Sequence, residues 1–212
     1  SLDGEILEER WVEGLQRPTG LLLDGDRLWA VDRRSLAEID VEQGEILRRL
    51  PLAGALFPND VALDDDGRLY VSDTRGDRIY RCEDDTFSVW LEGGGLNEPN
   101  ALLVRGDRLL VGNIDGTLLS CDLESGATRL EARLDRDANI DGLKEAGDGR
   151  LVVSDYNGRV HLVGPGGETS RLLDLTSSGT NCADLEYIRD REMLIVPGLF
   201  DNRLTAYRCR LP

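Results

Sequence analysis

The stretch Phe57-Pro58-Asn59-Asp60-Val61 is one of five versions of the same phrase in this 212-residue chain. The others are Arg17-Pro18-Thr19-Gly20-Leu21, Glu98-Pro99-Asn100-Ala101-Leu102, Asn139-Ile140-Asp141-Gly142-Leu143 and Asn181-Cys182-Ala183-Asp184-Leu185. The closing apolar residues of successive phrases are 40, 41, 41 and 42 residues apart. A period in the low forties, with only strand and turn signals between the phrases, predicts a β-propeller.

Each repeat has the pattern of four short strands separated by Asp-Gly and Gly-rich turns. In the second repeat we expect strands at 61–63, 68–73, 78–82 and 87–91. The second strand ends in Asp or Asn in four of the repeats. We expect these side chains to have a structural role, accepting hydrogen bonds from backbone N–H groups of the next turn. They are Asp32, Asp73, Asn113 and Asp155.

The beginning of the chain predicts how the ring closes. Gly4-Glu5-Ile6-Leu7 is identical to Gly44-Glu45-Ile46-Leu47, which leads into the fourth strand of the first repeat. Residues 3–14 are therefore expected to form a strand that completes the C-terminal blade and removes two sheet edges. The prediction is a single all-β domain over 1–212 with five four-stranded blades. The alternative is a six-bladed propeller that lacks one repeat. The repeats are expected at about 17–56, 57–97, 98–138, 139–180 and 181–212 plus 3–14.

Composition narrows the possible partners and sites. The net charge of −16 disfavours nucleic acid and anionic membrane surfaces. No apolar run approaches 18 residues, so we expect no membrane-spanning segment. No signal peptide is visible, which leaves the compartment open. Four cysteines without a Cys-x-x-Cys pair argue against a zinc site, and the single histidine, His161, is expected to be structural or on the surface. Lys144 is the only lysine, which we attribute to overall composition.

The polar positions of the phrase are the candidate site. Its third position is Thr19, Asn59, Asn100, Asp141 and Ala183, and its fourth position adds Asp60 and Asp184. A propeller gathers equivalent positions around one axis, so an oxygen-rich ring there predicts a metal site. The alternative is that these residues cap backbone N–H groups at strand starts. Capping is the preferred interpretation for both Asp60 and Asp184.

The phrases resemble those of the SMP-30/gluconolactonase/LRE-like family, also called regucalcin-like, and in particular its sugar lactone lactonases. The residues that support the resemblance are Phe57-Pro58-Asn59-Asp60-Val61, the run from Asp66-Gly67 to Ser72-Asp73, Glu98-Pro99-Asn100-Ala101-Leu102 and Ile140-Asp141-Gly142. The resemblance implies a hydrolase of a small lactone or ester with a divalent cation, of the calcium type, in the central tunnel. Family members have six blades and a Glu ligand from the first blade, which has no counterpart here, and their Asn-Gly is Asn100-Ala101.

The resemblance also assigns roles to residues. Asn100 and Asp141 match the family's Asn and Asp ligands, and Asn59 matches an Asn that faces substrate or metal. Asp184 is added from its place in the repeat. The expected metal set is therefore Asn100, Asp141, Asn59 and Asp184, with Asn59 also touching the small-molecule substrate. The cation would polarise a lactone carbonyl and Asp141 would be the general base. Two alternatives are a non-catalytic propeller that binds a ligand or protein, and a truncated or engineered scaffold without activity.

Overall fold

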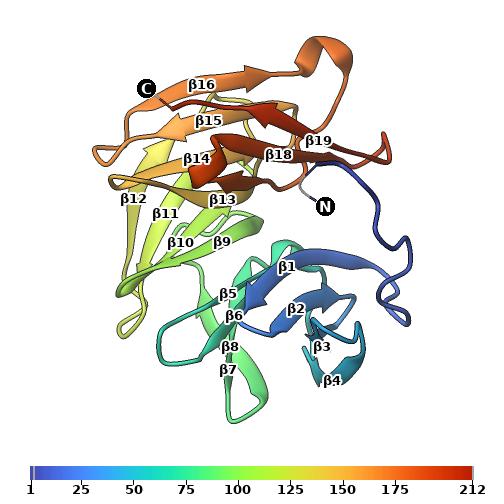
Figure 1. The fold of residues 1–212 in the computed structure, drawn as a ribbon. Helices are drawn as coiled ribbons and strands as arrows, with labels where there is room; N and C mark the ends of the chain where they lie inside the picture. The colour runs from blue at the N-terminus through green and yellow to red at the C-terminus, as the bar shows by residue number, and fades with distance from the viewer. Residues whose placement is uncertain (2, 212) are drawn as a thin grey trace.

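The protein is a five-bladed β-propeller, as predicted. The computed structural model describes residue 1 and residues 3–211. Each of its five sheets is an antiparallel meander, and the sheets follow one another around a central space, from the blue first blade to the dark red fifth blade (Figure 1). The first blade has β1 (Pro18–Asp24), β2 (Arg27–Asp32), β3 (Ser35–Asp40) and β4 (Ile46–Pro51). The second has β5 (Pro58–Leu63), β6 (Leu69–Asp73), β7 (Arg78–Glu83) and β8 (Thr86–Glu92).

The remaining blades repeat this arrangement. The third has β9 (Pro99–Arg105), β10 (Arg108–Asn113), β11 (Thr117–Asp122) and β12 (Thr128–Arg133). The fourth has β13 (Ile140–Gly147), β14 (Arg150–Asp155), β15 (Arg159–Val163) and β16 (Thr169–Asp174). The fifth has β17 (Glu186–Ile188), β18 (Met193–Gly198) and β19 (Arg203–Arg208). Three short 3-10 turns complete the elements: η1 (Thr74–Gly76), η2 (Thr176–Ser178) and η3 (Arg189–Arg191). No helix in the described part of the chain is long and apolar enough to cross a membrane.

The core lies between neighbouring blades. Alternating apolar residues on each sheet pack against the next sheet, as a half-buried strand pattern requires. The first two blades meet through residues such as Val31 and Val71, and the third and fourth through Leu110 and Val153. Similar clusters join the second blade to the third and the fourth to the fifth. The innermost strands β1, β5, β9, β13 and β17 therefore lie in sequence around the centre.

The repeated phrase forms a bulge at the start of the inner strand in the four complete blades. In the four complete blades, the register between the first and second strands shifts within the phrase, for example between Pro58 and Val61 and between Ile140 and Gly142. A bulge inserts an extra residue and redirects its side chain. The polar third and fourth positions of the phrase are those extra residues, so the bulges place them at the centre of the ring.

The structure corrects the predicted closure of the ring. The described residues between 3 and 14 contain no strand, and the fifth sheet has three strands with β19 at its edge. Trp11, Val12 and Leu15 instead pack against Ile39 and Ile46 on the outer face of the first blade. None of the apolar clusters in the described residues joins the fifth blade to the first. The N-terminal segment covers a face of the first blade and is not available to pair with β19.

This correction predicts different roles for the two identical tetrapeptides. Ile6 is 73% exposed, so Ile6→Ser should change the free energy of unfolding by less than about 0.5 kcal/mol. Ile46 pairs with Ile39 and contacts the cluster on the outer face, so Ile46→Ser should cost about 1–2 kcal/mol. Urea denaturation of both variants tests this. Equal losses would indicate that residues 4–7 form a packed strand in solution.

The Asp or Asn that ends the second strand has the predicted structural role in four blades, but its main donors are not those predicted. They lie in the segment that enters the blade, and among the described hydrogen bonds Asp155 alone of the four also accepts an N–H group of the next turn, that of Asn157 (3.0 Å). Asp73 accepts hydrogen bonds from the backbone N–H groups of Leu56 (3.0 Å) and Phe57 (2.6 Å). Asp32 accepts the Gln16 and Arg17 N–H groups in the same way. Asn113 accepts the Asn97 N–H, and Asp155 accepts the Asn139 N–H. These main donors precede the first strand of the same blade, so these side chains tie the segment entering the blade to its second strand. His161 is buried in β15, and all four cysteines are free thiols.

Candidate active site

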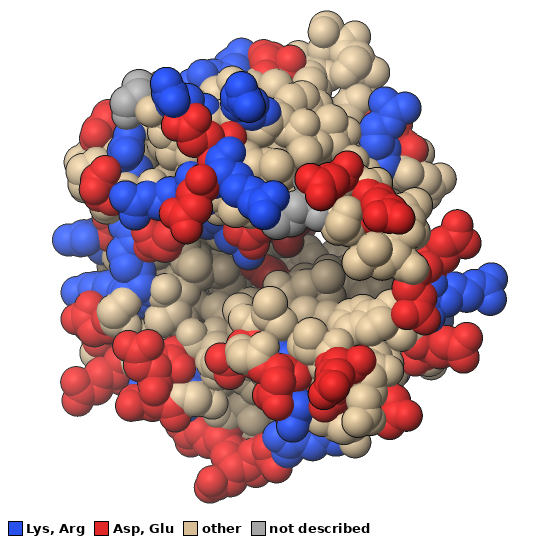
Figure 2. Space-filling view, in the orientation of Figure 1, with Lys and Arg blue, Asp and Glu red and all other residues tan. Residues whose placement is uncertain are grey.

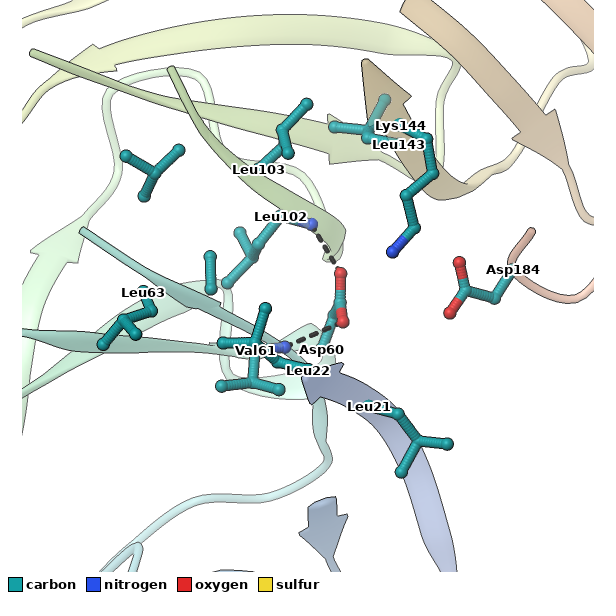
Figure 3. A pocket seen from close by; sticks show the side chains of 12 residues that line it. Leu21, Leu22, Asp60, Val61, Leu63, Leu102, Leu103, Leu143, Lys144 and Asp184 are labelled. Atoms are coloured by element: carbon teal, nitrogen blue, oxygen red, sulfur yellow. Dashed lines mark hydrogen bonds between the residues drawn. The ribbon is translucent and has the colours of Figure 1, made fainter. Parts of the chain in front are cut away.

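A small central pocket of about 100 Å³ lies where the inner strands meet. Strands β1, β5, β9 and β13 line it mainly with leucine and valine side chains. Its charged residues are Asp60, Lys144 and Asp184 (Figure 3). The space-filling view shows the molecule hollowed at its centre, with acidic side chains inside the hollow and around its rim (Figure 2). An apolar pocket with a few charged groups is the usual form of a small-molecule site.

Asp60 faces the pocket and also connects two blades. Its Oδ1 accepts the Val61 N–H (2.8 Å), and its Oδ2 accepts the Leu102 N–H of β9 (2.7 Å). The capping interpretation is therefore supported for Asp60, which lines the pocket as well. Burial, reinforced by the charge of Asp184, raises the pKa of Asp60 to about 8. Asp60 is mostly protonated at neutral pH.

Asp184 and Lys144 face Asp60 from the opposite side of the pocket (Figure 3). Asp184 has a left-handed backbone with φ of 65°, which Asp tolerates better than most residues. Burial raises the pKa of Asp184 although the Lys144 charge opposes the shift. The Lys144 Nζ lies 3.2 Å from Glu186 Oε2. Burial alone would lower the pKa of Lys144, but the charges of Glu186, Asp184 and Asp60 raise it, so Lys144 is an ammonium ion at neutral pH.

Asp141 is held by its two neighbours in the ring. Asn100 donates its side-chain N–H to Asp141 Oδ1, and the Asp184 backbone N–H donates to Oδ2 (3.0 Å). The structure thus brings together three of the predicted site residues. Burial, followed by the charge of Asp184, raises the pKa of Asp141 to about 6. A carboxylate has about four lone-pair positions, so Asp141 can still accept a proton from a water molecule.

Asn59 is not joined to this group. Its side-chain N–H donates to Thr74 Oγ1 (3.1 Å), and its backbone carbonyl accepts the Thr19 hydroxyl (2.7 Å). In the described chain, no hydrogen bond links Asn59 to Asn100, Asp141 or Asp184. Its predicted contact with substrate or metal remains a prediction.

The residues as placed do not fit the calcium site expected from the resemblance. Within residue 1 and residues 3–211, no three Asp, Glu, His or Cys side chains converge as metal ligands. Asn100 directs its N–H, not its oxygen, toward Asp141. A lysine ammonium also lies beside Asp184, and a second cation placed there would be repelled. Calcium binding remains a prediction that the geometry does not favour.

Lys144 lines the pocket but was not predicted to do so. As the only lysine of the chain it was assigned to composition, yet it follows Asp141 by three residues on β13. Simple alternation would place residues 141 and 144 on opposite faces of a strand. The bulge between Ile140 and Gly142 changes that relation. The sequence signal that identifies Lys144 is its position three residues after Asp141, an Asp that lies at a strand bulge.

The raised pKa of Asp60 predicts a pH-dependent stability. In the unfolded chain an Asp has a pKa near 3.9, so between about pH 4 and pH 8 the folded protein binds a proton that the unfolded chain has released. The contribution of Asp60 to the free energy of unfolding is therefore largest below pH 4, and it is lost as the pH rises through about 8. In thermal melts from pH 5 to 9, the Tm of Asp60→Asn should rise relative to the Tm of the parent protein as the pH increases. A constant difference would contradict the protonated Asp60.

Comparison with known proteins supports the architecture. A family model described as "Strictosidine synthase-like, N-terminal" matches residues 45–82. No curated protein sequence matches the chain significantly. A gluconolactonase from Xanthomonas campestris has a TM-score of 0.69 at 20% identity, over 89% of this chain and 71% of that one. A virginiamycin B lyase from Staphylococcus aureus has a TM-score of 0.67 at 10% identity, over 92% and 71%.

The nidogen/laminin complex contains another similar chain, with a TM-score of 0.71 at 17% identity over 90% of this chain and 79% of that one. These structural similarities show the propeller fold alone. The family match covers residues 45–82 and does not define the family of the whole chain.

Proposed function

We propose that the central pocket hydrolyses a small lactone or ester, with Asp141 as the general base. The observation that supports this most is Asp141 itself. It is a half-buried carboxylate in the ring, fixed by Asn100 and Asp184, with its pKa raised to about 6. A general base is most effective when its pKa lies near the working pH. The similarity to a gluconolactonase is consistent with this chemistry.

The mechanism uses the two carboxyl groups in different protonation states. Asp141, ionised at pH 7, takes a proton from a water molecule as the water oxygen attacks the carbonyl carbon. Breaking the ring or ester C–O bond then leaves an alkoxide, which needs a proton. Asp60, protonated at the same pH, is the pocket's acid for that step. Environments that separate the pKa values of two carboxyl groups are typical of such acid–base pairs.

The test is a hydrolysis assay with the folded protein. We expect acid release, followed with a pH indicator at pH 7, from at least one member of a panel of sugar-acid γ- and δ-lactones and short-chain esters. The rate should saturate with substrate. No turnover across the panel by protein with an intact circular-dichroism spectrum would contradict the proposal and favour the non-catalytic propeller.

A further inference from the structure

The fifth blade ends in a strand whose outer edge is unpaired. Each of the first four blades has a fourth strand outside its third, whereas the fifth sheet stops at β19. In the described part of the chain, β19 pairs with β18 and with no strand on its other side. A free strand edge presents unpaired N–H and C=O groups and is a template for another strand. The edge of β19 is therefore the place where a further strand can complete this blade.

The register of β19 identifies the backbone groups that are free. The Cys209 N–H donates to the Glu192 carbonyl, on the side of β18 (2.6 Å). The pairing of β19 with β18 has no register shift, and the backbone groups of successive residues point to opposite edges of a strand. Alternate residues before Cys209 therefore also bond to β18. The N–H and C=O groups of Leu204, Ala206 and Arg208 face the open edge.

The charges of β19 favour an acidic partner. Arg203 and Arg208, at the two ends of the strand, are exposed, and among the described residues neither forms an ion pair, whereas the nearby Arg210 pairs with Glu192. Residues 181–212 contain five acidic and five basic residues, although the whole chain has 41 acidic and 25 basic residues. The fifth repeat is thus neutral in a strongly acidic protein, and its edge strand carries positive charge without a counter-charge. Such a surface attracts acidic groups.

Between the two arginines, β19 presents a small apolar surface. Tyr207 packs into the apolar cluster between the fourth and fifth blades, so Leu204 and Ala206 lie on the opposite face of the sheet. Leu204 is 68% exposed, and its partner on β18 is Pro197, while Ala206 lies opposite Ile195. Apolar side chains of an added strand would lie beside Leu204 and Ala206 and remove this surface from water.

We propose that the open edge of β19 binds an extended acidic segment of a different polypeptide as the fourth strand of the fifth blade. Main-chain hydrogen bonds to the free edge supply affinity in this mode of recognition, and alternate side chains supply specificity. Acidic residues of the segment pair with Arg203 and Arg208, and apolar residues between them cover Leu204. The chain's own acidic N-terminal segment is held on the first blade through Trp11 and Val12, so the added strand comes from another protein. Binding at this edge is independent of the central pocket and of hydrolysis.

The first test uses a fluorescent synthetic peptide in which glutamate alternates with valine. We expect saturable binding to the folded protein at pH 7, measured by fluorescence anisotropy and weakened as NaCl is raised from about 50 to 300 mM. The same peptide with lysine in place of glutamate should bind about tenfold more weakly or worse, because like charges then meet at β19. No saturable binding of the acidic peptide, or equal binding of the two peptides, would overturn the proposal.

Variants of β19 locate the binding at its edge. Ala206→Pro removes an N–H group that faces solvent in the free protein, so Tm should change by less than about 4 °C while the peptide Kd rises about tenfold or more. Arg203→Glu combined with Arg208→Glu should reverse the preference toward the lysine peptide. The matched control, Arg34→Glu with Arg136→Glu, changes the net charge equally on the first and third blades and should bind as the parent does.

The same variants separate the possible occupants of the edge. If Ala206→Pro fails to fold, the charge reversal still decides, since an unchanged preference for the acidic peptide would contradict binding at β19. Dimerisation of the parent protein that depends on its concentration and is abolished by Ala206→Pro would assign the edge to a second copy of this chain and overturn the proposal. Sedimentation velocity measures this directly, and we expect the free protein to remain a monomer.

Discussion

Replacing Asp73 with Ala is expected to lower the free energy of unfolding by about 3–5 kcal/mol. Asp73 is fully buried. It accepts the Leu56 and Phe57 N–H groups and pairs with Arg78 Nε at 3.1 Å. The alanine variant leaves two backbone donors and a guanidinium group without their acceptor. Because small proteins are stable by about 5–15 kcal/mol, this loss is a large part of the total.

Urea denaturation of the variant checks this prediction, and Asp66→Ala is the matched control. Asp66 also pairs with an arginine, Arg68, at 2.8 Å, but its side chain is 74% exposed. Exposed pairs contribute about 0–1 kcal/mol, so the control should be nearly as stable as the parent. Similar losses for both variants would mean that Asp73 does not connect the entering segment to its blade.

The sequence predicts the blades well because each repeat specifies itself locally. In the second blade β5 begins at Pro58, three residues before the strand expected at 61–63, and the other three strands lie within one residue of their expected bounds. β6 is buried on both faces between neighbouring sheets, with the adjacent residues Tyr70 and Val71 on opposite faces. Periodicity and turn residues act over short distances, so no knowledge of the partner sheet is needed.

Closure of the ring could not be predicted in the same way. The identity of residues 4–7 with residues 44–47 indicates strand propensity but not which surface is available. That choice depends on Trp11, Val12 and Leu15, which bury their side chains on the first blade. Packing between segments distant in sequence therefore determines where the N-terminal segment lies.

In the candidate site too, some residue positions follow from the repeat and others depend on the three-dimensional structure. The ring position of Asp141 and Asn100 follows from the repeat, and a hydrogen bond joins the two side chains in the structure. The bulges decide which neighbouring side chains share that space, and they bring Lys144 and Asp60 into the pocket while Asn59 is bonded to Thr74. The sequence gives no direct measure of a bulge's effect on direction. The presence of Lys144 beside the pocket carboxyl groups could therefore be found only from the three-dimensional structure.

Replacing Asp141 with Asn is expected to lower kcat/KM for the lactone or ester substrate by about 10²–10⁴-fold. The amide keeps the size of the side chain and can still accept one of the two hydrogen bonds from Asn100 and the Asp184 N–H. It cannot accept a proton from water. In the parent protein, kcat/KM should rise with pH through about 6, as Asp141 loses its proton, and the variant should lack this rise.

Asp60→Asn is the matched control, because it changes a second carboxyl group of the ring, one that lines the pocket and accepts backbone N–H groups. With its pKa raised to about 8, Asp60 is already uncharged at pH 7, so the amide resembles the state that it replaces. If Asp60 is the proton donor to the leaving alkoxide, the variant should lose activity mainly on substrates with poor leaving groups and keep it on activated aryl esters. Asp141→Asn should lose activity on both. Activity that survives Asp141→Asn on both classes, in a variant with an unchanged Tm, would remove Asp141 from the catalytic role and place the base elsewhere in the ring.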